Sequence, residues 1–316
     1  MPGVAVPDVS IVIASHRKGS VGRCVEGIQG STERDVSLEI IVVADYPIEI
    51  LQERYSEARW IFHPDTGIPA KRNAGTMAAK SALVGFIDDD CVAQPGWAGA
   101  AVKFMEQNPG LSGFSGQTLV ERTRNTAYPV NEYKRLESPR FRTNNMFYVK
   151  KALSEIGGFD PRFTVQREDV DVAFSLLEKG LQIGHCEDSI VKHLHRAGEK
   201  WDLLKNCVNR RFDPLVYKKH RALYRQWIKT PFTPSIAAQA AFHGAVIVTA
   251  FLGVSTGLPC AVDLGFALAL SIRRNRGAAF HGMQIARDCM SFFIAPFVLL
   301  GALAQGSVKF RKVLIF

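Results

Sequence analysis

Three adjacent aspartates, Asp88, Asp89 and Asp90, follow the apolar run 83–87. Their mutual repulsion is costly, and a divalent cation is the simplest group that offsets it. On an extended segment alternate side chains point to opposite sides, so Asp88 and Asp90 can face one site while Asp89 faces another direction or a helix N-terminus. A solvated acidic turn is the alternative interpretation of the same three residues.

A phosphate-bearing ligand at this place would have to be neutralised by side chains and metal. The sequence contains neither GxGxxG nor GxxxxGK[ST], so it offers no glycine-rich loop that could bind phosphates through its backbone. Lys71 and Arg72 precede the aspartates in the chain. We expect these two cations to supply the positive charge together with the metal.

The segments around these residues predict an α/β fold. Strands that alternate with helices imply a doubly wound sheet, in which ligands bind beyond the carboxyl ends of the strands. Ser15, Asp45 and the aspartates from Asp88 to Asp90 each follow an apolar, strand-like run, so we expect them to converge on one site. The strands are expected at 9–14, 38–44, 59–63 and 83–87, and the helices at 21–29, 48–58 and 69–82.

Six segments follow one another in a characteristic order: VSIVIASHR, IIVVADYP, GIPAKRNAG, VGFIDDDCVAQPGW, SEIGGFDPRF and REDVDVAFSLLEKG. Over residues 8–195 this order resembles glycosyltransferase family 2, whose members have the GT-A fold. The resemblance implies transfer of a sugar from a nucleotide diphosphate donor to a hydroxyl acceptor, with inversion at the anomeric carbon. It also implies a divalent cation, Mg²⁺ or Mn²⁺, as the cofactor.

On the donor side, the resemblance assigns roles to residues at the strand ends. Ala14 and Ser15 would touch the nucleotide, and Asp45 would hydrogen-bond the base. Lys71 and Arg72 would contact the base or the phosphates.

The resemblance also assigns the aspartates to a DxD motif at the donor and the metal. Asp88, with Asp89 beside it, would lie toward the ribose or the metal, and Asp90 would bind the metal that bridges the diphosphate. His193 or His195 would complete the site of the metal or of the pyrophosphate. A His-x-His pair on a strand places both rings on the same face.

On the acceptor side, Glu168 and Asp169 would form the catalytic acidic pair, with Asp169 as the base that takes the proton of the acceptor hydroxyl. The turn at 157–159 would lie near the acceptor. Asp169 has an alternative interpretation as the N-cap of a helix over 170–179.

The sequence departs from the family pattern at two points of the donor side. The loop after the first strand reads SHRKG, where family members often carry Tyr-Asn, and Cys91 follows the aspartates where a polar residue is expected. The residues therefore identify the chemistry better than the sugar.

The net charge is divided unevenly along the chain. Its 39 basic and 30 acidic residues give a formal charge of +9, which by itself suggests a nucleic-acid partner. Residues 1–191 carry a net −4, however, and residues 192–316 carry +13. In residues 192–229 the cations are interleaved with aromatic residues, which suits an anionic membrane surface. The alternatives are single-stranded nucleic acid, or a diphosphate that Arg210 and Arg211 bind. We expect the membrane surface and no nucleic acid.

The end of the chain is apolar enough for a membrane. No charged residue occurs from Thr230 to Val262, and roughly 20 apolar residues suffice to cross a bilayer. A second apolar piece at 261–272 is short for a crossing, which allows a re-entrant hairpin over 235–272. Gln239 and His243 in the first run keep open the alternative of a soluble helical domain. A third uncharged run spans 291–308, and basic clusters at 273–276 and 309–312 predict the cytoplasmic face of the membrane.

We therefore predict a GT-A catalytic domain over 1–195, a basic neck over 196–230 and a helical, membrane-associated region over 231–316. The expected function is transfer of a sugar to a lipid-linked or surface-polysaccharide glycan. The alternatives are a polyprenyl-phosphate glycosyltransferase, a sugar nucleotidyltransferase, and a catalytically silent protein that binds a sugar nucleotide or RNA.

Overall fold

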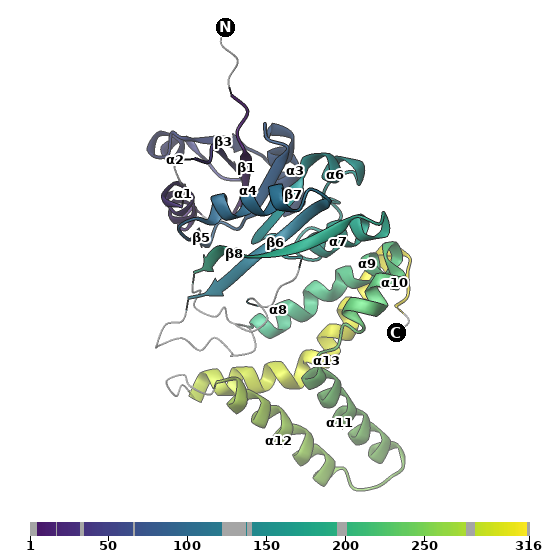
Figure 1. Ribbon diagram of the computed structural model, residues 1–316. Helices are drawn as coiled ribbons and strands as arrows, with labels where there is room; N and C mark the ends of the chain where they lie inside the picture. The colour runs from purple at the N-terminus through teal and green to yellow at the C-terminus, as the bar shows by residue number, and fades with distance from the viewer. Residues whose placement is uncertain are drawn as a thin grey trace. The chain divides into compact units, whose positions relative to one another are not determined.

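The computed structural model describes residues 5–16, 18–31, 35–65, 67–121, 137, 141–194, 201–275 and 282–314. The chain forms two compact units. The first comprises Met1–Glu121 and Lys134–His195, and the second comprises Arg122–Tyr133 and Arg196–Phe316. The first unit is α/β, and the second is helical (Figure 1).

The described strands of the first unit form one mixed sheet in the order β3-β2-β1-β4-β7-β6-β8-β5. Strands β3, β2, β1 and β4 are parallel, whereas β7 runs antiparallel to β4 and to β6. Since β6 ends at the carboxyl edge of the parallel strands, the chain enters β7 from that edge and runs back. The strands are Val9–Ser15 (β1), Leu38–Ala44 (β2), Ala58–Phe62 (β3), Leu83–Ile87 (β4), Cys91–Ala93 (β5), Leu111–Val120 (β6), Asn145–Val149 (β7) and Gln182–His193 (β8).

Helices cover both faces of this sheet (Figure 1). Side chains alternate along a strand, so Ile11 and Ile13 of β1 pack on one face with α1 and α4, while Val12 packs on the other with α3, α6 and α7. This two-sided burial explains why β1, β2 and β4 are almost continuously apolar. The helices are Val21–Gly30 (α1), Glu49–Arg54 (α2), Ile68–Ala78 (α3), Trp97–Gln107 (α4), Lys150–Glu155 (α6) and Glu168–Glu178 (α7).

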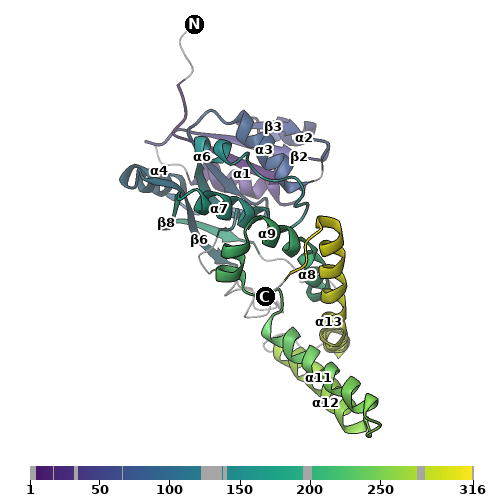
Figure 2. The ribbon, with the colours of Figure 1, turned by 90° about the vertical axis from the view of Figure 1, so that its right-hand side faces the viewer.

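In the second unit, two helices of equal length, α11 and α12, lie side by side as a hairpin (Figures 1 and 2). The uncharged run at 291–308 lies within a longer helix, α13, which bends partway along (Figure 1). Pro296 lies inside α13 and cannot donate a backbone hydrogen bond, which accounts for the bend. The elements are Asp202–Asn209 (α8), Arg210–Phe212 (η1), Asp213–Lys219 (α9), Arg221–Leu223 (α10), Tyr224–Ile228 (η2), Pro234–Phe251 (α11), Gly257–Arg274 (α12) and Gly282–Phe310 (α13).

Polar side chains of the hairpin face inward. Gln239 Nε2 of α11 donates to both the carbonyl and the carboxylate of Asp263 on α12, and His243 Nδ1 lies 2.6 Å from Asp263 Oδ2. His243 Nε2 lies 2.7 Å from the carbonyl oxygen of Phe293, three residues before Pro296 on α13. All three polar side chains are buried. Each therefore finds its partner on a neighbouring helix.

Apolar side chains of the same helices face outward. Phe251 and Leu258, at the tip of the hairpin, are 89% and 76% exposed. Helices α11 and α13 are long and apolar enough to cross a membrane. These two helices are therefore candidate membrane spans, and α13 also buries apolar side chains such as Phe292 and Leu299.

Candidate active site

A fully buried lysine ties the ends of β1 and β2 together. Lys71 Nζ on α3 donates to the carbonyl oxygen of Ser15 at 2.8 Å and lies 2.7 Å from His16 Nδ1 and 3.0 Å from Asp45 Oδ2. Burial lowers the pKa of Lys71, although Asp45 opposes this effect. Burial raises the pKa of Asp45, but the hydrogen bonds and charges of Lys71 and His16 outweigh it, so the pKa of Asp45 is lowered. Asp45 is therefore held as a carboxylate.

The middle aspartate of the run binds the end of β1. Asp89 Oδ2 accepts hydrogen bonds from Ser15 Oγ at 3.0 Å and from the backbone N–H of His16 at 2.9 Å. The Ser15 hydroxyl also lies 2.6 Å from the hydroxyl of Tyr46. The Asp89 carboxylate thus points toward β1 and holds the end of that strand against the turn after β4.

Arg72 connects the aspartate turn to the acidic pair. Its guanidinium donates to Glu168 Oε1 at 2.8 Å and to Asp88 Oδ1 at 3.2 Å, and it stacks over the ring of Phe159 at 5.5 Å. Burial lowers the pKa of Arg72, but the charges of Glu168 and Asp88 outweigh it and raise the pKa. Two carboxylates far apart in the sequence are therefore held by one buried cation.

The position of Arg72 is fixed by its neighbour Asn73. The Asn73 side chain donates to the carbonyl oxygen of Phe159 and accepts from the Phe159 N–H, both at 2.8 Å. The chain reaches Phe159 through Gly157 and Gly158, whose φ angles of 81° and 73° favour glycine. This double hydrogen bond joins α3 to the turn that follows α6.

Glu168 and Asp169 begin helix α7, and the residue before them, Arg167, has a φ of 81°. The N-cap position belongs to Arg167, and Asp169 Oδ1 accepts a hydrogen bond from the Val170 N–H at 2.7 Å. Glu168 is buried, and its Oε2 atom accepts no hydrogen bond from the described residues. Burial raises the pKa of both carboxyls, although Arg72 opposes the rise. A carboxylate with a raised pKa is a stronger base.

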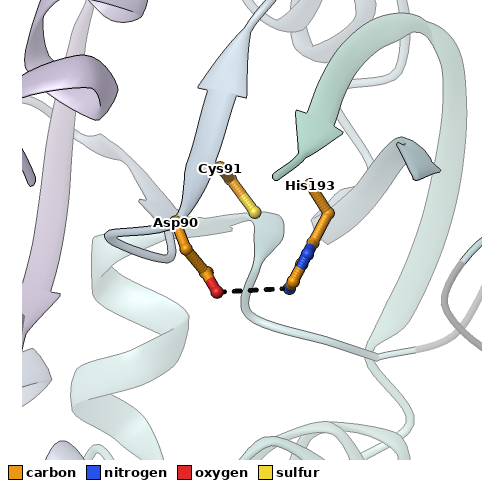
Figure 3. A group of neighbouring side chains, drawn as sticks. All are labelled: Asp90, Cys91 and His193. Atoms are coloured by element: carbon orange, nitrogen blue, oxygen red, sulfur yellow. Dashed lines mark ion pairs between the residues drawn. The ribbon is translucent and has the colours of Figure 1, made fainter. Parts of the chain in front are cut away.

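The third aspartate lies beside a histidine and a cysteine (Figure 3). Asp90 Oδ2 is 3.5 Å from His193 Nε2, and Cys91 Sγ completes a group whose ligand atoms lie within 4.8 Å of one another. The antiparallel pairing of β5 and β8 sets Cys91 directly opposite His193, and the Leu194 N–H donates to the Asp90 carbonyl. Register therefore brings the three side chains together.

This donor set fits a divalent cation. His193 Nδ1 lies 3.0 Å from the Leu194 carbonyl oxygen, which can only accept, so the ring proton belongs on Nδ1. The Nε2 atom faces the Asp90 carboxylate at 3.5 Å. This separation leaves the two atoms placed to bind one cation, and imidazole and carboxylate are common ligands of Mn²⁺ and Zn²⁺.

Residues 10–163 match the family model described as glycosyl transferase family 2. This segment is a family 2 glycosyltransferase domain. The predicted family is thereby confirmed. Among curated proteins, the pre-mycofactocin glycosyltransferases of two Mycobacterium tuberculosis strains, CDC 1551 / Oshkosh and ATCC 25618 / H37Rv, are each 27% identical to the chain. The match covers 60% of this chain and 43% of the relatives, so the chain accounts for less than half of their length.

The fold of the domain is shared with a solved glycosyltransferase. A crystal structure of GalNAc-T7 with UDP, GalNAc and Mn²⁺ superimposes with a TM-score of 0.51 over 67% of this chain and 50% of its own, at 15% sequence identity. At this identity the similarity shows the fold alone. It confirms the predicted GT-A fold with its mixed α/β sheet.

The first unit brings the predicted residues into three groups. One consists of Lys71 and Asp45 with the end of β1, where Ala14 is partly exposed. Arg72 holds Asp88 and the acidic pair, and Asp90 lies with His193. His195 lies outside the described residues.

Three residues of these groups were not predicted to take part. His16 contacts Asp45 and Lys71, Tyr46 contacts Ser15, and Cys91 lies with Asp90 and His193. His16 and Tyr46 directly follow strand-end residues that were singled out, so their position was the available signal. Cys91 gave no signal in the sequence beyond its departure from the family pattern.

Proposed function

We propose that this chain is a metal-dependent, inverting glycosyltransferase that transfers a sugar from a nucleoside diphosphate to a hydroxyl group. The observation that carries the proposal is the connection made by Arg72, which holds the aspartate turn and the acidic pair of α7 in one site. A donor bound at the aspartates would thereby lie within reach of a base on α7.

On the donor side, Asp45 would accept a hydrogen bond from the base of the nucleotide. The charge of Lys71 keeps its carboxyl ionised, and His16 limits its rotation. Asp88 is partly exposed and directs its Oδ1 to Arg72, which leaves Oδ2 for the ribose or the metal. Asp89 would act indirectly, by fixing Ser15 and the end of β1.

Asp90 and His193 would hold the metal. When bound, the ion would neutralise the charge that develops on the leaving diphosphate.

Asp169 would take the proton of the acceptor hydroxyl as the oxygen attacks the anomeric carbon in line with the leaving diphosphate. Its raised pKa makes it a stronger base than an exposed aspartate, and the N-terminus of α7 stabilises the carboxylate that must be present first. Glu168, which is bound by Arg72, would orient this end of the helix. One direct displacement inverts the configuration of the sugar.

The second unit would attach the enzyme to a membrane. The support is the reversed polarity of the hairpin, with Gln239, His243 and Asp263 inside and exposed apolar side chains outside. Arg273 and Arg274 close α12, which suits an anionic cytoplasmic surface. An acceptor that is itself lipid-linked would then diffuse in the same surface as the enzyme.

The experiment is a turnover assay of the full chain in detergent with Mn²⁺ and a panel of nucleotide sugars, beginning with UDP sugars. Release of nucleoside diphosphate identifies the donor. Asp169→Asn should lower turnover by about 10²- to 10⁴-fold, the usual contribution of a general base. Asp90→Asn should abolish the dependence on Mn²⁺.

Asp35→Asn is the matched control, because Asp35 is exposed and precedes β2. This variant should turn over at the normal rate. Normal turnover by Asp169→Asn would remove the proposed base, and a product with retained anomeric configuration in its proton NMR spectrum would contradict direct displacement.

A further inference from the structure

The metal group contains a sulfur atom that the proposed function does not use. Cys91 is fully buried at the start of β5, and its Sγ lies in the same group as the Asp90 oxygen and the His193 nitrogen. Figure 3 shows the Cys91 sulfur on one side of the line that joins the Asp90 oxygen and the His193 nitrogen, and the three ligand atoms lie within 4.8 Å of one another. The register opposes Cys91 to His193 across an antiparallel pair, which puts both side chains on the same face of the sheet.

We propose that Cys91 is a third protein ligand of the metal, so that the site binds thiophilic divalent ions such as Co²⁺, Zn²⁺ and Cd²⁺ in preference to Mg²⁺. This inference rests on the proposed metal site at Asp90 and His193. A set of one carboxylate, one imidazole and one thiolate is typical of Zn²⁺ and Co²⁺ sites, whereas Mg²⁺ binds oxygen ligands. The ordinary DxD site therefore gains a soft ligand here.

Binding through sulfur requires the thiol to lose its proton. As the metal–sulfur bond forms, that proton passes to solvent, which makes the affinity dependent on pH. The remaining coordination positions stay open for the oxygens of a diphosphate, since three protein ligands do not fill a tetrahedral or larger shell.

A second buried cysteine provides the matched control. Cys24 on α1 is also fully buried, and its Sγ lies 3.5 Å from the carbonyl oxygen of Asp88. It lies beside the same aspartate turn but outside the metal group. If both buried thiols are only structural, replacing either one should have the same effect on metal binding. If Cys91 is a metal ligand, its replacement should weaken metal binding and that of Cys24 should not.

The test is a titration of the full chain in detergent with Co²⁺, followed by its absorption spectrum. The unmodified protein and Cys24→Ser should show a sulfur-to-cobalt charge-transfer band, and Cys91→Ser should lose it. Affinity for Cd²⁺, measured by calorimetry, should fall by at least about tenfold in Cys91→Ser, the low end of what loss of even an outer-shell partner costs. Circular dichroism confirms that each variant is folded, and Cys91→Ala replaces Cys91→Ser if the serine variant is not.

The outcomes separate this proposal from the proposed function. Co²⁺ bound without the charge-transfer band, or a band that survives in Cys91→Ser, overturns the role of Cys91 and leaves Asp90 and His193 as ligands. Binding that is unaffected by His193→Ala overturns the metal site itself. Tighter binding of Mg²⁺ than of Cd²⁺ also contradicts the proposal.

Discussion

At the scale of single residues, the candidate site depends on one buried guanidinium. Arg72 contacts Asp88 and Glu168 and lowers the pKa of both Glu168 and Asp169 against the effect of burial. A positive charge favours the ionised form of a neighbouring carboxyl. The proposed base therefore relies on Arg72 to be deprotonated at a lower pH than burial alone would allow.

Replacing Arg72 by glutamine should move the acid limb of the kcat/KM profile to higher pH. Loss of the positive charge raises the pKa of Asp169, so the fraction of ionised base falls at every pH below that pKa. Activity at the optimum should also fall, by roughly 10²-fold, because the acidic pair loses its positioning contact. A pH series of initial rates measures both effects.

Two further variants make the Arg72 test specific. Arg72→Lys keeps the charge and should shift the acid limb less than Arg72→Gln. Arg59→Gln removes the same charge at an exposed position of β3 and should leave the profile unchanged. An acid limb that stays in place in Arg72→Gln would show that Arg72 does not control the base.

At the scale of elements, the site depends on how α3 is joined to the turn after α6. A Cβ atom on Gly158 would lie 2.6 Å from Asn73 Oδ1, which makes the double hydrogen bond with Phe159. A Cβ atom on Gly157 would meet nothing within 4 Å, although its φ is also positive. Comparing alanine substitutions of the two glycines therefore distinguishes the cost of backbone strain from the cost of losing the hydrogen bonds between Asn73 and Phe159.

Gly158→Ala should lower the melting temperature further than Gly157→Ala. Both variants carry the cost of a left-handed residue, about 1–2 kcal/mol. Gly158→Ala should add about 1–3 kcal/mol, because the Asn73 amide loses buried hydrogen bonds. Thermal unfolding of the two variants side by side measures the difference, and equal melting temperatures would mean that Asn73 adapts without loss.

At the scale of the whole molecule, exposed apolar side chains occur in both units, but they gather along the helices of the second. The tip of the hairpin carries Phe251 and Leu258, whereas in the first unit Met77 of α3 is 82% exposed. Single exposed apolar residues are ordinary on a soluble surface, whereas a contiguous group of them marks a surface for a membrane or for another protein.

Replacing Phe251 and Leu258 together by aspartate should shift the protein from the membrane fraction to the soluble fraction. Each charge within a bilayer core costs about 2.5–3.5 kcal/mol on insertion scales, so two should oppose insertion strongly. Met77→Asp is the control and should not change the partition. The measurement is sedimentation of membranes before and after a high-salt wash, and recovery of the unmodified chain in the soluble fraction would contradict membrane attachment.

The sequence by itself determined the first four strands of the sheet and the helices between them. Runs such as 9–15 and 38–44 are apolar on both faces and end in polar residues, so they predicted buried strands with Ser15 and Asp45 at the carboxyl edge. These are local properties, because a short window of neighbouring apolar and polar residues is enough to predict a buried strand. Alternation of strands with helices predicted a doubly wound α/β sheet, and the resemblance of six segments to glycosyltransferase family 2 implied the GT-A fold.

Only the tertiary structure decided which charged residues pair. Arg72 and Glu168 are 96 positions apart, and Cys91 meets His193 only because β5 and β8 are neighbours in antiparallel register. Whether Gln239 and His243 face lipid, water or one another likewise depended on Asp263 of the next helix. Such contacts follow from sheet order, register and helix packing, which depend on the whole chain and which no local pattern of residues specifies.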